Sequence, residues 1–454
     1  MAVGAWELPP GPPAMPARQA VAWVRRPLEL LEDCGRQFGD AFTLRLAGMP
    51  PLVMLSDPVA IREVLTGDPR TLRSGEANAA LQAALGRRSL LLLDGDEHLQ
   101  ERRLLLPAFH GERMRRYGEL IAGVAEREVA RWPVDRPLPL APAMRRIALE
   151  VIGRAVIGVD EPARLAALTQ ALRRLLDATT SPAQLLVLMT LRPGGRAMRA
   201  WQRTSPTLRG VDTLLYDEIA RRRADGSGAG REDILSLLLQ ARDEDGAPMG
   251  DRHLRDELMT LLVAGHETTA TALAWAFERL VRHPEAYDRV RAEAGSADGD
   301  PYLDAVIKET LRVRPVIPFV VRQVAEPVEL AGRRWPAGVR LAPCVHLVHR
   351  RPDVYPEPDA FRPERFLETP PGTYTWIPFG GGTRRCLGAA FALFEARVVL
   401  RVVGSAGRLV ADRPRAEAIG RRGIALVPAR GARVHWRKNV DASELTAQET
   451  TPAG

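Results

Sequence analysis

The sequence contains few cysteines and few aromatic side chains. Three cysteines, Cys34, Cys344 and Cys386, occur among 454 residues, and aromatic residues make up 5% of the chain. Three scattered thiols are too few for a disulfide framework or a cysteine-rich zinc cluster, as is typical of proteins from a reducing compartment. The composition therefore predicts a cytoplasmic protein in which one thiol is free to bind a cofactor.

Targeting and membrane segments are also missing. The opening residues, Met1 to Trp6, lack the basic start and the apolar core of a signal peptide. No apolar stretch reaches the roughly 20 residues that a transmembrane helix needs. We therefore expect no transmembrane anchor.

The net charge is moderate. The chain has 64 Lys and Arg against 56 Asp and Glu, a net charge of +8. This excess is not the concentrated basic patch of a nucleic-acid-binding domain, so we expect no nucleic acid partner. An acidic protein is the more natural partner, and Arg102, Arg103 and Arg385 are candidates for its docking face. An ordinary solvated basic surface explains the same arginines equally well.

Hydrophobic periodicity favours one large, mainly α-helical domain. Hydrophobic residues make up 46% of the chain and no break in composition divides it. We predict a single domain over residues 8–437 and a disordered polar tail over residues 438–454. Apolar spacing of three and four residues predicts helices over Leu28–Phe38, Arg113–Trp132, Met144–Ile157, Pro162–Thr179, Met198–Arg223 and Leu254–Val281. Short strand-like segments at Ala41–Leu46, Leu52–Ser56, Phe319–Val324, Val328–Leu330 and Ala432–Trp436 predict a small sheet beside this helical body.

A glycine-rich loop places one cysteine directly before a strongly helical segment. The loop runs from Phe379 to Gly388 and contains Gly380, Arg384 and Cys386. A helix N-terminus stabilises negative charge, so the spacing predicts a deprotonated Cys386 that acts as a ligand. The glycines would let the backbone approach a flat group, Phe379 would pack against the sulfur, and Arg384 would neutralise a carboxylate of that group. These features describe a haem with cysteine as its axial ligand, against the alternative of a buried structural cysteine.

A second segment carries an acid beside hydroxyl groups in an otherwise apolar helix. Glu267 and Thr268 follow Ala264 and Gly265 within Leu258–Leu273. Burying an acid in such a helix is costly unless the acid has a purpose. Gly265 would let the helix pass close over a haem. The alternative is a core helix whose threonine bonds to its own backbone.

Two further pairs lie on single helix faces. Glu309 and Arg312 are three residues apart, which by itself is a common and weak ion pair. His98 and Arg102 are four apart, and both can donate to a pair of carboxylates, although a lone histidine is more often a surface residue.

Together these motifs resemble the cytochrome P450 haem-thiolate superfamily. Its Phe-x-x-Gly-x-Arg-x-Cys-x-Gly loop is matched at Phe379, Gly382, Arg384, Cys386 and Gly388, and the motifs appear in the family's order. The resemblance extends roughly from Leu8 to His435. It implies the cytochrome P450 fold, a large helical body with a small β-sheet subdomain. Haem b, iron protoporphyrin IX, would lie between a long central helix and the cysteine loop, with Cys386 as the iron ligand.

The resemblance also implies roles for the other motifs. The family's Ala-Gly-x-Glu-Thr motif is matched from Ala264 to Thr268, so Thr268 would hydrogen-bond the oxygen ligand and Glu267 would supply protons through water. The family's buried Glu-Arg-Arg network is matched at Glu309, Arg312 and Arg365. The propionates would be bound by His98, Arg102, Arg322 and Arg384. Histidine at position 98, where microsomal relatives have tryptophan, indicates the soluble bacterial branch.

The implied activity is that of a monooxygenase. It would insert one oxygen atom from O2 into a lipophilic small molecule, by hydroxylation or epoxidation. Because only 68 residues follow Cys386 (454 − 386), we expect NAD(P)H-derived electrons to arrive through a separate ferredoxin or flavodoxin with its reductase. We expect a monomer. A peroxide-driven peroxygenase or isomerase, and a non-enzymatic haem-binding protein or sensor, are the alternatives.

The substrate pocket is the least specified part of the sequence. By the resemblance, Val263, Ala264, Ile317, Pro318 and Phe319 would face the distal side of the haem. The apolar stretches Ala79–Leu85 and Ala183–Met189 are interpreted as loops that line or gate the pocket. These residues predict an apolar substrate without identifying it.

Overall fold

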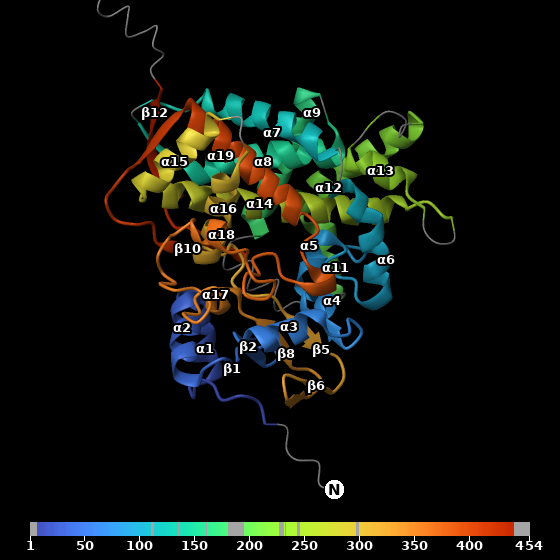
Figure 1. Cartoon of the computed structure of the whole chain (residues 1–454). Coiled ribbons are helices and arrows are strands. Elements are labelled where there is room, and N and C mark those ends of the chain that lie inside the picture. Colours follow the sequence, from blue (N-terminus) through green and yellow to red (C-terminus); the bar gives the residue numbers. More distant parts are fainter. Residues whose placement is uncertain are drawn as a thin grey trace, which may run out of the picture.

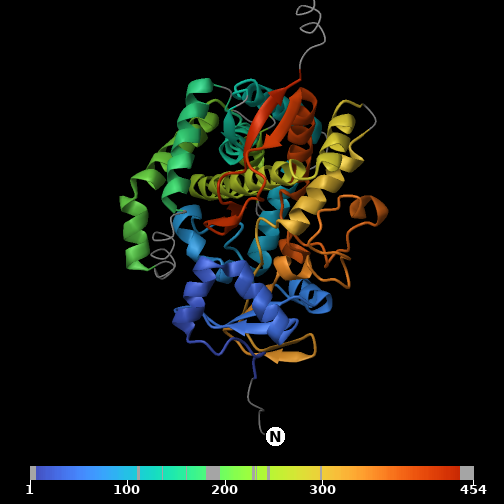
Figure 2. The same ribbon diagram turned by 90° about the vertical axis from the view of Figure 1, so that its left-hand side faces the viewer.

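The computed structural model describes residues 7–439, apart from residues 110–112, 135, 160, 180–194, 227–230, 232, 243–245 and 297–298. Most of the chain is helical, and the strands form small sheets, which confirms the predicted mainly α class. Figure 1 shows the helical body in the upper part of the molecule and the N-terminal helices with the largest sheet below it. Figure 2 shows the same division from the side.

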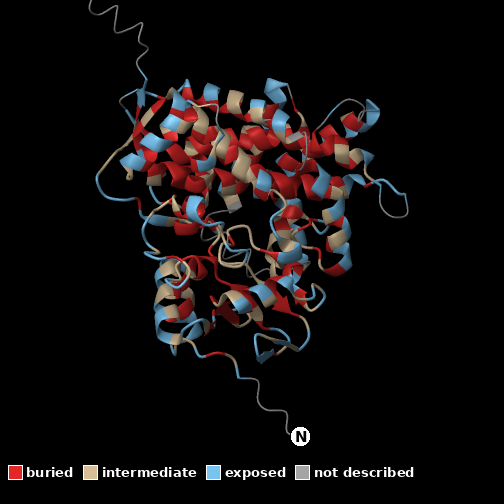
Figure 3. Cartoon of the chain, in the orientation of Figure 1, coloured by how far each residue is buried: buried red, intermediate tan, exposed pale blue. Residues whose placement is uncertain are grey.

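The longest helix, α14 (Asp251–Leu280), runs through the middle of the helical body. It packs along α8 (Leu140–Ile157), and both helices are buried over most of their lengths. The main hydrophobic core includes residues of both helices and of α7 (Arg113–Val129), α16 (Pro301–Val313) and α19 (Ala389–Ala406). Figure 3 shows this buried layer along the length of the helical body.

The remaining helices of the body surround this core. They are α9 (Pro162–Thr179), α11 (Arg196–Thr204), α12 (Pro206–Ala224), α13 (Ile234–Gln240) and α15 (Pro284–Ala294).

The largest sheet has five strands in the order β1-β2-β8-β5-β3. β2 and β8 are parallel and the other pairs are antiparallel. Its strands are β1 (Ala41–Leu44), β2 (Leu52–Leu55), β3 (Leu72–Arg73), β5 (Arg322–Val324) and β8 (Arg340–Pro343). The sheet packs with α1 (Pro16–Arg25), α2 (Pro27–Phe38) and α3 (Pro58–Thr66).

Three smaller sheets complete the strand structure. Their strand orders are β4-β12-β9, β10-β11 and β6-β7. Their bounds are β4 (Pro137–Pro139), β6 (Val328–Leu330), β7 (Arg333–Trp335), β9 (Gly407–Ala411), β10 (Ile419–Arg422), β11 (Ala425–Pro428) and β12 (Arg433–Lys438).

The segments near the site are short helices. α6 (Gly95–Leu105) is the longest of them, and the others are α4 (Ser74–Ala77), η1 (Ala79–Leu81), α5 (Gln82–Leu85), η2 (Leu106–Phe109), α17 (Val345–Val348), α18 (Arg365–Glu368) and η3 (Gly382–Arg384). In the described part of the chain, no helix combines the length and the apolar character that crossing a bilayer requires.

Several predicted elements differ from the observed ones. The helix predicted over Met198–Arg223 is two helices, because Ser205 caps α12 by accepting a hydrogen bond from the Leu208 amide (3.4 Å) and Pro206 begins the new helix. The segment Ala79–Leu85, interpreted as a loop, is helical. The strand predicted from Phe319 begins only at Arg322.

Two further predictions concern residues outside the described part of the chain or at its boundary. Ala183–Met189 lies outside the described residues. Lys438, assigned to the tail, is the last residue of β12, whereas residues 440–454 lie outside the described part.

Candidate functional site

The cysteine loop ends at the N-terminus of α19, as the spacing predicts. Gly388 is the N-cap of α19, and the Cys386 amide donates to the Phe379 carbonyl (2.9 Å), which closes the loop. The Cys386 side chain is exposed. The ring of Phe379 packs edge-on against Trp376, with centroids 6.0 Å apart. The loop thus presents an accessible thiol directly before a long, largely buried helix.

The protonation of Cys386 differs from the sequence-based expectation. Although the side chain is accessible, the surrounding protein atoms desolvate the thiol and raise its pKa above its ordinary value, while the Gly388 amide, Arg102 and Arg385 act in the opposite direction. The helix N-terminus therefore does not by itself lower the pKa of this thiol below its ordinary value. A coordinated metal ion deprotonates a thiol outright, so the expected role requires the iron itself.

Two glycines of the loop lie against α3. A Cβ on Gly382 would lie 1.8 Å from the carbonyl oxygen of Leu65 on α3, and Gly382 has a φ of +62°. A Cβ on Gly381 would lie 2.9 Å from Cδ1 of the same leucine. These two glycines let the loop pack directly on α3, and the approach of a flat ligand stays a prediction. Gly380, with a φ of +66°, turns the loop.

Four predicted propionate ligands come together beside the cysteine loop. Arg102, Arg322 and Arg384 all lie close enough to His98 to lower its pKa, and with burial they bring it to about 3. His98 is buried rather than on the surface, and its Nδ1 has no hydrogen-bond partner. Arg102 is also within electrostatic range of Cys386. The cluster therefore extends from α6 and β5 to the cysteine loop.

This cationic cluster contains more positive charge than its protein partners balance. Asp94 accepts from Arg384 Nη2 (2.6 Å), but it also accepts from the amides of Gly75 (2.8 Å) and Glu76 (2.9 Å). Burial lowers the pKa of both Arg322 and Arg384 to about 10. Nε of Arg384 has no partner. Unmatched, buried donors of this kind fit the two carboxylates of a haem.

The motif on α14 has a geometry that the sequence only partly predicted. Thr268 donates from Oγ1 to the Ala264 carbonyl (2.8 Å), the backbone bond that the alternative interpretation expected. A Cβ on Gly265 would lie 2.9 Å from Cδ1 of Ile152, so Gly265 makes room for α8; a close approach of α14 to a haem stays a prediction. α14 continues unbroken through this segment. Ala264 is exposed and Thr268 is half-buried.

Glu267 lies in a buried network of charges. Its Oε1 is 3.7 Å from Nη1 of Arg145 on α8 and 3.4 Å from Nε of Arg422 on β10. Arg422 also pairs with Asp177 on α9. Burial raises the pKa of Glu267, and Arg422 and Arg145 oppose this rise. Neither carboxylate oxygen makes a hydrogen bond, so the acid can still accept a water molecule.

The Glu-Arg-Arg set assembles into a buried network. Arg312 donates from Nε to Oε2 of Glu309 (2.7 Å) and from Nη2 to Oε1 (2.8 Å), and Arg365 donates from Nε to Oε1 (3.1 Å). Arg312 also donates to the carbonyls of Pro358 and Ala360. The network thus joins α16 to the chain that leads into the cysteine loop, and Arg312 and Glu309 are both fully buried.

Three of the five predicted pocket residues pack in two different regions. Val263 and Ile317 pack against the main core, whereas Phe319 packs on Trp23 of α1 at a centroid distance of 5.3 Å. A cavity of about 560 Å³ lies elsewhere, beside Asp94, and contains none of the five. Its lining includes Arg70, Arg73, Gly75, Glu76, Arg87 and Asp94.

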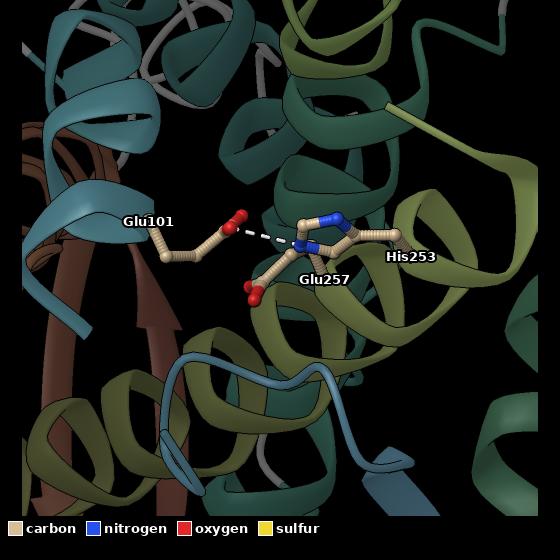
Figure 4. A group of neighbouring side chains, drawn as sticks. All are labelled: Glu101, His253 and Glu257. Carbon is tan, nitrogen blue, oxygen red and sulfur yellow. Dashed lines mark ion pairs between the residues drawn. The ribbon is translucent and has the colours of Figure 1, made fainter. Parts of the chain in front are cut away.

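One group of ionisable residues was not anticipated from the sequence. Glu101, His253 and Glu257 converge from α6 and α14, as Figure 4 shows. Only the four-residue spacing of His253 and Glu257, which places both on one helix face, could have indicated it.

Comparisons with known proteins show the family and the fold of this chain. A family model described as cytochrome P450 matches residues 9–403. A Mycobacterium tuberculosis protein provisionally named cytochrome P450 135B1 is 46% identical over 452 residues, which cover 98% of this chain and 95% of that protein. Another from the same species, provisionally named cytochrome P450 137, is 40% identical over 441 residues, covering 94% of this chain and 91% of the other. The solved structure of retinoic acid bound cyanobacterial CYP120A1 has a similar fold, with a TM-score of 0.81, 24% identity, and coverage of 96% of this chain and 100% of that one.

Proposed function

The chain belongs to the cytochrome P450 family and is a haem-thiolate monooxygenase, and we propose that it inserts one oxygen atom from O2 into a lipophilic small molecule. The observation that supports this most directly is the accessible Cys386 beside the cationic group of His98, Arg102, Arg322 and Arg384. When bound, haem would supply the iron at which oxygen is activated.

We assign the haem contacts to two sets of residues. Cys386 would be the iron ligand, and Phe379, Gly380 and Gly388 would shape the loop around it. His98, Arg102, Arg322 and Arg384 would hold the propionates, because their buried donors lack sufficient negative charge in the chain itself. We propose haem b, the form that the family resemblance implies.

Glu267 and Thr268 would handle protons and water. The hydroxyl of Thr268 already donates to Ala264, so its oxygen remains free to accept a proton donor such as water. Glu267 has a raised pKa and two oxygens without hydrogen bonds, which suits an acid that exchanges a proton. Its arginine partners, Arg145 and Arg422, would hold the carboxylate in place.

We propose that electrons derived from NAD(P)H arrive through a ferredoxin or flavodoxin. Arg103 and Arg385 are exposed, and Arg385 is within electrostatic range of Arg102. Basic side chains beside the cysteine loop suit an acidic electron carrier. The cytoplasmic location and the monomeric state stay predictions.

The first experiment is the carbon monoxide difference spectrum of the dithionite-reduced protein. A strongly red-shifted Soret band that disappears in Cys386→Ser is the expected result. A band at the ordinary histidine–haem position in the wild type would contradict the assignment of Cys386. Spin-state shifts of the same protein would then identify lipophilic substrates.

The role of Thr268 is tested with a matched neighbour. Thr268→Ala should uncouple NAD(P)H consumption from product formation. Thr269→Ala should keep the coupling, because Thr269 also bonds back to its helix, at the Gly265 carbonyl (3.1 Å), but is buried. Equal coupling in both variants would refute the assignment and favour a peroxide-driven reaction.

A further inference from the structure

Three potential metal ligands meet between α6 and α14. Glu101 comes from α6, and His253 and Glu257 lie one turn apart on α14. Each offers one ligand atom, and these atoms all lie within 4.8 Å of one another. Oε2 of Glu101 is 2.8 Å from Nε2 of His253. Figure 4 shows the three side chains pointing toward a common point.

Three of the four carboxylate oxygens at this point are buried and make no hydrogen bond of good geometry. Glu257 is 0% exposed, and neither of its oxygens makes a hydrogen bond of good geometry. Oε1 of Glu101, which is also buried, has no partner either. No ion pair among the described residues joins either glutamate to an arginine or lysine. A buried carboxylate without a partner costs several kcal/mol, so two together call for a cation.

The nearest charged groups do not supply that cation. Asp256, next to Glu257, adds a further negative charge and itself pairs with Arg255 (2.9 Å). Arg255 is further engaged by Asp212 (2.6 Å). The positive charge of Arg255 is therefore already matched. Burial, Glu101 and Asp256 raise the pKa of Glu257 well above its ordinary value, and the Leu90 amide only partly opposes this.

The ligand set suits zinc. Imidazole nitrogen and carboxylate oxygen are both zinc ligands, at about 2.0–2.2 Å, and a water would complete the four positions. Tetrahedral bonds of that length separate the ligand atoms by about 3.4 Å. The observed atoms reach this spacing if Glu101 and His253, now 2.8 Å apart, move apart slightly and any separation that approaches 4.8 Å shortens. The side chain of His253 is 23% exposed and provides an entry path.

We propose that Glu101, His253 and Glu257 bind one Zn²⁺ ion that joins α6 to α14. α6 also carries His98 and Arg102, and α14 carries Ala264 and Thr268 further along. The ion would therefore fix the distance between the helix that contacts the propionates and the helix that carries the oxygen-activating motif. Its role would be structural, because the three ligands lie apart from Cys386 and from Thr268.

The test uses the haem-loaded protein, dialysed against a chelator and then titrated with Zn²⁺. We expect one tightly bound equivalent by competition with a chromophoric chelator. The zinc K-edge spectrum should show only nitrogen and oxygen ligands near about 2.0–2.2 Å and no sulfur near about 2.3 Å. Zinc should also raise the melting temperature, because it binds only the folded site.

Variants connect the bound ion to these residues. Glu257→Gln and His253→Gln should each weaken zinc binding by at least about 100-fold. Losing a residue that only orients a ligand already lowers metal affinity by about 10–100-fold, and losing a direct ligand should lower it more. His435→Gln is the matched control, because His435 meets only one carboxylate, Asp412, at 3.2 Å. It should bind zinc as the wild type does.

Three results would overturn the proposal. They are no stoichiometric zinc in the wild type, unchanged binding in both ligand variants, or sulfur in the coordination shell. The first would mean that a proton, not a metal ion, occupies the site. None of them bears on Cys386, whose test is the carbon monoxide spectrum.

Discussion

A single buried glutamate should make the fold less stable as pH rises. Glu395 lies on α19, six residues into the helix that follows the cysteine loop, and is 1% exposed. Its Oε1 has no hydrogen-bond partner. Burial alone raises the pKa of Glu395 from 4.5 to about 8. The folded protein therefore keeps this proton over a range in which the unfolded chain has lost it.

The sign and the size follow from this difference. Between about pH 4.5 and pH 8 the unfolded chain binds one proton fewer than the folded protein, so the free energy of unfolding falls as pH rises. The slope is about 1.4 kcal/mol per pH unit, so the full loss, reached above pH 8, is of the order of 5 kcal/mol. Glu395→Gln has the same shape without the ionisation. Its advantage over the wild type should be small near pH 5 and largest above pH 8.

Thermal unfolding of the haem-loaded proteins at a series of pH values measures this effect. Far-ultraviolet circular dichroism and Soret absorbance should be followed together, because a protein with a tightly bound cofactor need not unfold in two states. Glu126→Gln, at an exposed glutamate on α7, is the control and should follow the wild type at every pH. A difference between Glu395→Gln and the wild type that is absent, or that does not change with pH, would refute the reasoning.

Three further predictions concern the frame of the site. Glu309→Gln leaves two buried arginines without their full charge partner and should destabilise the protein by about 3–5 kcal/mol, seen as a lower melting temperature; an unchanged melting temperature would contradict this. Gly382→Ala would place a Cβ 1.8 Å from the Leu65 carbonyl and should reduce the haem content after expression, whereas Gly210→Ala, where a Cβ meets nothing within 4 Å, should not. Arg384→Gln should release haem to apomyoglobin about 10–100 times faster, as loss of a charge-assisted hydrogen bond implies, and equal rates would exclude a propionate contact.

The sequence predicted the helices well where hydrophobic periodicity is strong. Pro162–Thr179 has the predicted bounds, and the long helix predicted over Leu254–Val281 differs from α14 only at its ends. Periodicity alone failed at Ser205, because the apolar spacing continues across a serine–proline cap that starts a new helix. Short helices such as α5 have too few turns to show any periodicity.

The sequence predicted which residues lie together near the cysteine loop better than it predicted their burial and their pKa values. His98, Arg102, Arg322 and Arg384 do come together, although they are far apart in the sequence. Burial, however, depends on neighbours that a motif does not specify. Burial raises the pKa of Cys386, and the packing of Ile152 against Gly265 could not be read from the motif either. The group of Glu101, His253 and Glu257 was missed because Glu101 lies on another helix, and the sequence does not show which helices pack together.

Burying a carboxylate without a charge partner is costly at both Glu395 and Glu257, but the cost is relieved in different ways. Both carboxyl groups are buried, and neither is paired with an arginine or lysine among the described residues. Among the described residues no second ionisable group lies beside Glu395, so the least costly solution is a proton. At Glu257 a second carboxylate and an imidazole lie within 4.8 Å, and one divalent ion can satisfy all three at once. What decides between a proton and a metal ion is therefore the number of donors that converge, more than the depth of burial.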